Sequence, residues 1–150
     1  MKYPAFLILP SIEDYRKYYE TKYCKKPIIT FDGIPVYFSK SKFDHAFFES
    51  SKRNKIKDKF STIRAQRMTW IAKTLTHPNA VLYQGWDKKR RRYDPRWRVN
   101  VVFDDYVVVL KITVTKENKL KGEFRTAYKA ENSIGKIKAS PKWHKDLVLK

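Results

Sequence analysis

The densest cluster of residues able to do chemistry is the basic run in "DKKRRRYDPRWR". The run consists of Lys88, Lys89, Arg90, Arg91 and Arg92. Aromatic side chains are interleaved with it, at Trp86, Tyr93 and Trp97. Guanidinium and ammonium groups bind phosphates, and aromatic rings stack on bases. The combination predicts contact with RNA or another single strand; a basic loop or a localisation-like signal is the alternative interpretation.

Two arginines lie in the apolar stripe of a helix that the sequence predicts from about residue 58 to residue 75. At about 100° per residue, Arg64 and Arg67 share one arc with the apolar side chains. Those side chains are Phe60, Ile63, Met68, Trp70, Ile71 and Leu75. Burial of an unpaired guanidinium is unfavourable. Each arginine therefore reaches the edge of the stripe, pairs with a carboxylate such as Asp44 or Glu49, or points into a cleft where a phosphate completes its bonding.

Alternating side chains predict strands at 80–86, 96–103, 106–115 and 120–128. One face is apolar, with Trp97, Val99, Val101 and Phe103 on the second of these strands. If the registers align, the other face carries Arg98, Asn100, Lys111, Thr113 and Arg125. A cationic open face suits a phosphate backbone, and a merely solvated face is the alternative. By the same alternation, Thr126 shares the apolar face with Phe124.

The remaining elements precede these strands. Ser11 is the predicted N-cap of a helix that runs to residue 23, and Asp32-Gly33 predicts a hairpin in which Pro35 marks an edge strand. A short phenylalanine-rich helix and the helix at 58–75, stopped by Pro78, follow. We therefore expect one α+β domain, with helices packed on one face of a four-stranded antiparallel meander. Residues 1–27 form an N-terminal helical extension, 28–130 the core and 131–150 an irregular or weakly helical tail.

The charge of the chain restricts its partners. Lys and Arg number 34 against 15 acidic residues, a formal charge of +19, which favours a polyanionic partner. No apolar run approaches the ~18 residues that span a bilayer, and no basic amphipathic helix is evident, so we expect no membrane partner. The single Cys24 excludes an intramolecular disulfide. No spacing predicts a metal site or a Gly-rich phosphate loop, so we expect neither metal nor cofactor.

The order of motifs resembles a known nuclease group. "FDHAFFE" is followed by "RAQRMTWIAKTLTHPNAV", then by "RRRY" and a terminal "FRTAY". This order, over residues 34–128, resembles the phage-associated branch of the barnase, EndoU, colicin and RelE-like (BECR) nuclease superfamily. The resemblance implies a helical pair on an antiparallel sheet and a metal-independent site that cleaves RNA. It also implies site residues: His45, Arg67 with its neighbour Arg64, and the last-strand pair Thr126 and Tyr128.

These residue types suit transesterification of RNA. The 2′-OH attacks the adjacent phosphate, giving a 2′,3′-cyclic phosphate and a 5′-OH. His45 is the candidate base, Arg64 or Arg67 the clamp on phosphate oxygens, Thr126 a hydrogen-bond donor, and Tyr128 a proton donor or stacking partner. His45 as an ordinary surface histidine is the alternative.

We therefore expect a metal-independent endoribonuclease, as a toxin or phage effector acting on tRNA, mRNA or rRNA in the cytoplasm or delivered into a target cytoplasm. A toxic nuclease would require an acidic inhibitor or immunity protein, which the positive charge suits. The alternative is a non-catalytic RNA- or DNA-binding module with a nuclease-like fold.

Overall fold

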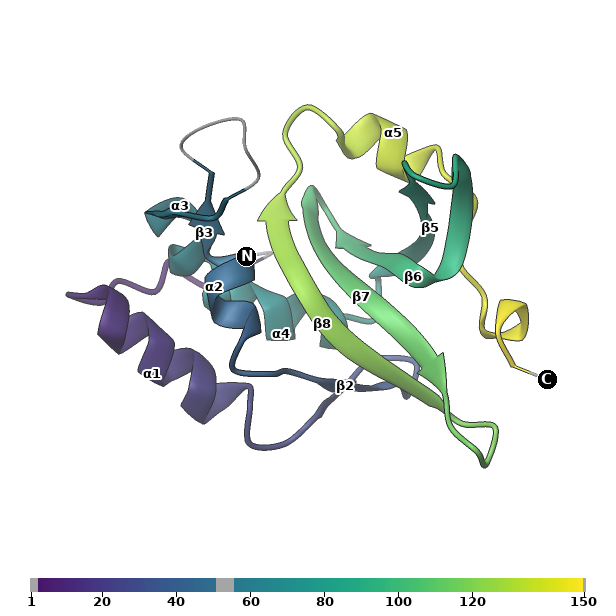
Figure 1. Cartoon of the computed structure of the whole chain (residues 1–150), viewed down its shortest axis with the longest axis horizontal. Coiled ribbons are helices and arrows are strands. Elements are labelled where there is room, and N and C mark those ends of the chain that lie inside the picture. The colour runs from purple at the N-terminus through teal and green to yellow at the C-terminus, as the bar shows by residue number, and fades with distance from the viewer. Residues whose placement is uncertain (1–2, 51–55, 150) are drawn as a thin grey trace.

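The computed structural model describes residues 3–50 and 56–149. The helices are α1 (Ile12–Lys22), α2 (Lys42–Ala46), α3 (Thr62–Gln66), α4 (Met68–Thr76), α5 (Ile134–Lys138) and the 3-10 turn η1 (Lys145–Leu147). The strands are β1 (Ile28–Ile29), β2 (Pro35–Tyr37), β3 (Phe48–Glu49), β4 (Lys59–Phe60), β5 (Val81–Asp87), β6 (Arg92–Phe103), β7 (Tyr106–Val114) and β8 (Leu120–Lys129). Helices α1 to α4 lie on one side of a curved sheet, and α5 lies near β5 (Figure 1).

The main sheet has six strands in the order β1-β2-β8-β7-β6-β5. Strands β5 to β8 pair antiparallel with their neighbours in sequence, as expected. The predicted four-stranded, wholly antiparallel sheet is wrong, because β2 adds to β8 in parallel and β1 adds to β2. A second sheet joins β3 to β4. Strands of two or three residues are too short to show a period-two pattern, so the sequence did not reveal this extension.

The predicted hairpin at Asp32-Gly33 is confirmed, with β1 antiparallel to β2 and a φ of 92° at Gly33. The prediction that Pro35 marks an edge strand is wrong, since β2 lies between β1 and β8. Proline is tolerated here because it is the first residue of the strand, and the pairing with β8 begins at Val36.

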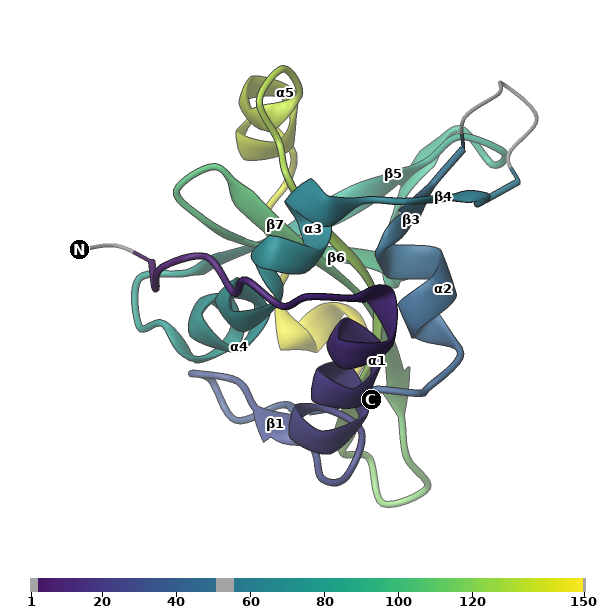
Figure 2. The same cartoon turned by 90° about the vertical axis from the view of Figure 1, so that its left-hand side faces the viewer.

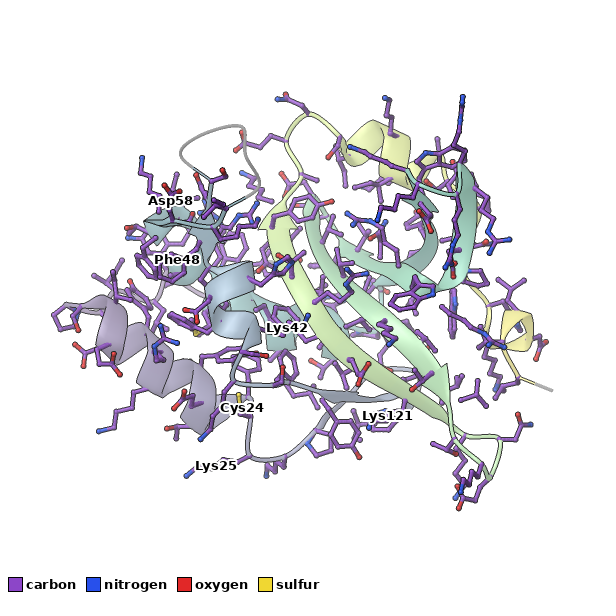
Figure 3. All side chains as sticks on the ribbon, in the orientation of Figure 1. Cys24, Lys25, Lys42, Phe48, Asp58 and Lys121 are labelled. Atoms are coloured by element: carbon purple, nitrogen blue, oxygen red, sulfur yellow. The ribbon has the colours of Figure 1, made fainter. Side chains whose placement is uncertain are left out.

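The main core lies between the helices and one face of the sheet, and side chains from both fill this space (Figure 3). Tyr19 of α1 is fully buried, with its ring centroid 5.7 Å from that of Phe47 and 5.9 Å from that of Phe43. The sheet contributes alternate residues, among them Val99, Val101, Val108, Leu110 and Phe124. The aromatic side chains of α1 therefore form part of the same core as the sheet.

The single helix predicted from about residue 58 to residue 75 is wrong. Strand β4 occupies its start, and the rest divides into α3 and α4, which meet at Arg67. Arg67 leaves helical geometry with a ψ of 15°, and Ile63, placed in the apolar stripe, is 65% exposed. The break reorients the turn that carries Arg64 relative to the turn that carries Trp70. Arg64 and Arg67 therefore do not share one stripe.

Two bulges decide which side chains reach the face of the sheet opposite the main core. In β8, Leu110 pairs with Phe124 and Val109 pairs with Thr126, so Arg125 is an extra residue. The expectation that Thr126 joins Phe124 in the core is wrong, because this bulge moves Thr126 to the opposite face. The inward position expected for Trp97 is also wrong, since Trp97 lies in an irregular part of β6 and is 46% exposed.

The opposite face carries a second, smaller core under α5. It comprises Tyr83, Val102, Val107, Val109, Ala130 and Ile137. The chain after β8 thus covers part of this face. The last residues return to the other side of β5, where Trp143 and Val148 join the main core. In the turned view of Figure 2, α5 stands apart from the layer formed by α1 to α4.

Replacement of Tyr19 tests whether α1 belongs to the main core. Tyr19→Ala removes a fully buried ring and its hydrogen bond to the Ser39 carbonyl, so we expect it to lower the free energy of unfolding by about 3–5 kcal/mol. Tyr18→Ala, at the half-buried neighbouring position, is the matched control and should cost clearly less. Urea unfolding measures both. Equal losses would show that α1 packs no more tightly than a peripheral extension.

Candidate nucleic-acid interface

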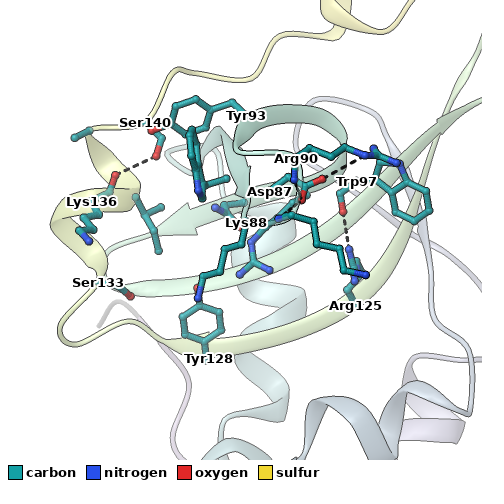
Figure 4. Close-up of a pocket in the computed structure, with 16 residues that line it drawn as sticks. Asp87, Lys88, Arg90, Tyr93, Trp97, Arg125, Tyr128, Ser133, Lys136 and Ser140 are labelled. Atoms are coloured by element: carbon teal, nitrogen blue, oxygen red, sulfur yellow. Dashed lines mark hydrogen bonds and ion pairs between the residues drawn. The ribbon is translucent and has the colours of Figure 1, made fainter. Parts of the chain in front are cut away.

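A cleft of about 1180 Å³ opens on the sheet face opposite the main core, between the β5–β6 turn and α5 (Figure 4). Its walls come from β5, β6, β8 and the segment 133–140. The lining residues are Trp86, Asp87, Lys88, Lys89, Arg90, Tyr93, Trp97, Arg98, Asn100, Arg125, Tyr128, Ser133, Lys136, Ile137, Ala139 and Ser140. Six of these are cationic and one, Asp87, is anionic, so the cleft favours an anion.

One wall of the cleft is the irregular part of β6. Val99 pairs with Gln84 and Asp94 pairs with Gly85, so residues 95–98 protrude from the ladder. The buried Asp94 carboxylate accepts the backbone N–H groups of Arg96 at 2.8 Å and Trp97 at 3.0 Å. Burial alone would raise the pKa of Asp94, but these donors and the nearby arginine cations hold that pKa below its ordinary value. Asp94 is therefore the anionic anchor of this wall.

The other side of the wall is fixed by the end of the chain. The indole Nε1 of Trp143 donates to the Pro95 carbonyl at 2.7 Å, and Lys142 forms a bridge with Tyr83. Because both sides of residues 95–98 are held, Trp97 and Arg98 project from a fixed backbone.

Two guanidinium groups converge inside the cleft. Arg98 lies across Gly85, where a Cβ would overlap its side-chain stem, and Arg125 donates to the Trp97 carbonyl at 2.8 Å. Burial lowers the pKa of Arg125, and the neighbouring Arg98 cation lowers it further. Across residues 3–50 and 56–149, neither group forms an ion pair with a carboxylate. This like-charged pair lacks the anion that would offset its repulsion.

A polar row crosses the sheet beside these arginines. Asn100 pairs with Val109, which pairs with Thr126, so the two polar side chains flank Val109 on the cleft side. Asn100 is 4% exposed, and its Oδ1 and the Thr126 Oγ1 are buried without a hydrogen-bond partner within the described chain. Unpaired buried polar atoms are uncommon in a folded protein. The row gives the cleft a polar base between the arginines and Tyr128.

The structure divides the basic run of the β5–β6 turn. Lys88, Lys89 and Arg90 line the cleft, whereas Arg91 and Arg92 do not contribute to its described lining. Arg90 is partly neutralised, with Asp94 at 3.5 Å and Asp87 at 3.9 Å. Trp86 and Tyr93 pair edge to face, with their ring centroids 5.1 Å apart, and both are partly exposed. This part of the cleft therefore offers both cations and exposed ring surface.

Three of the predicted catalytic residues lie around one edge of β8. Tyr128 lines the cleft, and the Arg64 guanidinium carbon is 6.0 Å from the centre of its ring. Arg64 also donates to the carbonyl of Ala46 at 3.4 Å, next to His45 on α2. Partial burial lowers the pKa of His45, and the cations of Lys57, Lys42, Arg125 and Arg64 lower it further. His45 itself is not among the residues described as lining the cleft.

Arg67 is placed elsewhere. Its guanidinium carbon lies 4.7 Å from the ring centre of Phe6 and 5.1 Å from that of Trp70, and it donates to the Ile63 carbonyl at 2.8 Å. Its Nε is buried without a partner in the described part of the chain. Aromatic faces attract a guanidinium, so the N-terminal segment supplies much of what this cation needs. Arg67 does not line the cleft as described.

Sequence reasoning missed the contribution of the C-terminal segment. Ser133, Lys136 and Ser140 line the cleft, although the sequence predicts an irregular or weakly helical tail here. A signal was present, because Ser133 stands before Ile134 and Ile137, an N-cap residue type before apolar positions three apart. Lys111, expected on the binding face, lies just outside the cleft with its Nζ 4.4 Å from the ring centre of Trp97.

No family model, curated protein or solved structure matches this chain. Within the described residues, no three or more His, Cys, Asp or Glu side chains form a group that could hold a metal ion. No helix in the described ranges is both long enough and apolar enough to cross a membrane. The assignment of function therefore depends on the cleft itself.

The electrostatic setting of His45 can be measured. We expect its imidazole to titrate below the ordinary value of 6.5, so that it is neutral at pH 7 and able to accept a proton. Lys57→Ala should move the midpoint up towards 6.5, because it removes one of the cations that disfavour imidazolium. Lys73→Ala, on exposed α4 surface, is the control. Histidine NMR titration gives the midpoints; a value at or above 6.5 in the unmodified protein would contradict this electrostatic description.

Proposed function

We propose that this protein binds single-stranded RNA in the cleft between the β5–β6 turn and α5. The observation that carries the proposal is the pair formed by Arg98 and Arg125, two adjacent guanidinium groups with no described carboxylate partner. A phosphate diester supplies the missing anion, and guanidinium binds phosphate through charge-assisted hydrogen bonds. The formal charge of +19 adds attraction at longer range.

The exposed rings favour a single strand over a duplex. Trp86, Tyr93 and Trp97 are 48%, 37% and 46% exposed. Bases inside a duplex are stacked on each other and do not offer a free face, whereas single-stranded bases stack on aromatic side chains. RNA is chosen over DNA because the resemblance to the BECR nucleases implies an RNA substrate. Single-stranded DNA of the same sequence is the comparison that tests this choice.

Removal of the arginine pair should weaken binding and reduce its salt dependence. For Arg98→Ala with Arg125→Ala, the slope of log affinity against log salt should fall by about 0.7 for each phosphate that is no longer neutralised. Lys17→Ala with Lys22→Ala removes the same charge from exposed positions on α1, on the opposite side of the sheet, and should leave affinity nearly unchanged. Fluorescence anisotropy with a labelled oligonucleotide at several salt concentrations measures both variants.

An equal loss of affinity in the α1 control would show that total charge, not the cleft, determines binding. An unchanged slope in the arginine variant would show that the pair does not bind phosphate. Circular dichroism of each variant provides the check that folding is retained.

Ribonuclease activity is the second candidate function, and the proximity of Arg64 to Tyr128 at the edge of the cleft favours it. A phosphate held by Arg125 would lie near the Tyr128 hydroxyl, which can donate a proton to a leaving oxygen. His45, with its lowered pKa, is a neutral base on the adjacent α2. The BECR-like arrangement implied by the sequence would place these groups around the scissile phosphate. Arg67 has no part in this version, because aromatic rings surround its guanidinium.

Cleavage separates the two candidates. If the protein is a nuclease, labelled RNA incubated with it in EDTA should yield 2′,3′-cyclic phosphate ends. Tyr128→Phe and His45→Gln should then each slow single-turnover cleavage by about 10²–10⁴-fold, the usual contribution of a general acid or base. Arg67→Ala is the matched control and should keep its activity in the folded fraction. Intact, protected RNA would leave binding as the function and eliminate the nuclease.

A further inference from the structure

A second hollow, of about 580 Å³, adjoins the cleft beyond Trp97. It lies between the protruding part of β6, the end of β7 and the C-terminal segment. Its lining residues are Arg96, Trp97, Lys111, Ile112, Thr113, Val114, Thr115, Lys116, Asn118 and Val148. Trp97 lines both the hollow and the cleft, so the two spaces meet at its ring.

The hollow exists because β6 leaves β7. The two strands are paired from Phe103–Tyr106 to Val99–Leu110, and the preceding residues of β6 follow β5 instead. Beyond Leu110, β7 keeps β8 as its paired neighbour on one side only. The bulge held by Asp94 therefore produces two features together, the wall of the cleft and the gap beside β7.

The hollow has the chemistry of a phosphate-binding track. Arg96, Lys111 and Lys116 contribute cations, and its described lining contains no Asp or Glu. Arg96 and Lys116 are exposed. Lys111 lies at the junction, with its Nζ 4.4 Å from the Trp97 ring centre and 3.9 Å from the Glu123 carboxylate. Cations with weak or no acidic partners thus continue from the cleft, past an exposed ring, into the hollow.

We infer that one RNA strand occupies both spaces, with its backbone passing from the cleft over Trp97 into the hollow beside β7. The inference rests on the proposed function, since it extends the same strand into a second segment of the site. Trp97 would stack a base at the junction, and Arg96 and Lys116 would bind the phosphates that follow. An acidic polypeptide is the other chain that cations beside a strand edge could receive, but the shared ring of Trp97 favours a ligand with bases to stack.

Oligonucleotide length tests the inference. A trinucleotide can fill the cleft alone, whereas a nonanucleotide can reach the hollow. In Arg96→Ala with Lys116→Ala, each phosphate left without its cation should lower nonanucleotide affinity by about fivefold to tenfold at 50 mM salt, and the salt slope by about 0.7. Trinucleotide affinity should not change. The Lys17→Ala, Lys22→Ala protein should match the unmodified protein at both lengths.

The other outcomes overturn the inference in distinguishable ways. If the unmodified protein binds neither length, the proposed function fails and the inference fails with it. If the unmodified protein binds both lengths and the affinity of the hollow variant is unchanged, or falls equally at both lengths, RNA binding stands and the second segment is rejected. If the hollow variant loses affinity for a polyglutamate peptide but keeps its RNA affinity, the hollow receives an acidic chain instead.

Discussion

The buried carboxylate of Asp94 is the constraint on which the open face of this protein depends. It accepts two successive backbone N–H groups from residues that have left the β5–β6 ladder, and it pairs with Arg90 across the hairpin. Without such an acceptor, those N–H groups would lack the partners that a ladder provides, which is unfavourable in a partly buried segment. The protruding segment presents Trp97 and Arg98 and separates β6 from the end of β7. One acidic side chain thus supports the wall of a basic cleft.

The two faces of the sheet divide stability and charge between them. On one face, a cluster of aromatic side chains from α1, α2 and β8 packs around Tyr19. On the other face, cations gather around the cleft and the adjoining hollow, and two of them, Arg98 and Arg125, oppose each other. Uncompensated charge of one sign destabilises a compact state. The extensive aromatic core can offset that repulsion, and an anionic ligand would relieve it directly.

The cleft has more binding chemistry than catalytic chemistry. Cations, exposed rings and a polar row at Asn100 and Thr126 line or underlie it, whereas His45 and Arg64 lie outside its described lining. A nuclease would need the substrate to extend over the edge of β8 to reach them. This geometry is why binding is proposed first and cleavage second. The buried, unpartnered oxygens of Asn100 and Thr126 are the polar atoms of this face that have no physical account in the described chain.

The sequence by itself determined the general organisation of the protein. The alternation in 80–128 predicted β5 to β8, Ser11 predicted the start of α1, and the excess of Lys and Arg predicted an anionic partner. These signals are local, since a period, a cap or a composition can be read within one segment. It also selected most of the cleft cations, because a dense basic run with aromatic neighbours is visible without a fold.

Only the tertiary structure decided which side chains meet. The extra residue at Arg125 moved Thr126 to the cleft face, and the helix break placed Arg67 between Phe6 and Trp70 rather than in a stripe with Arg64. The return of the chain after β8 brought Lys136 to the cleft. A bulge shifts the alternation of a strand by one residue, and its position depends on what the neighbouring strand and the packed segments can accommodate. Such interactions join residues far apart in the chain, so no local pattern could have fixed them.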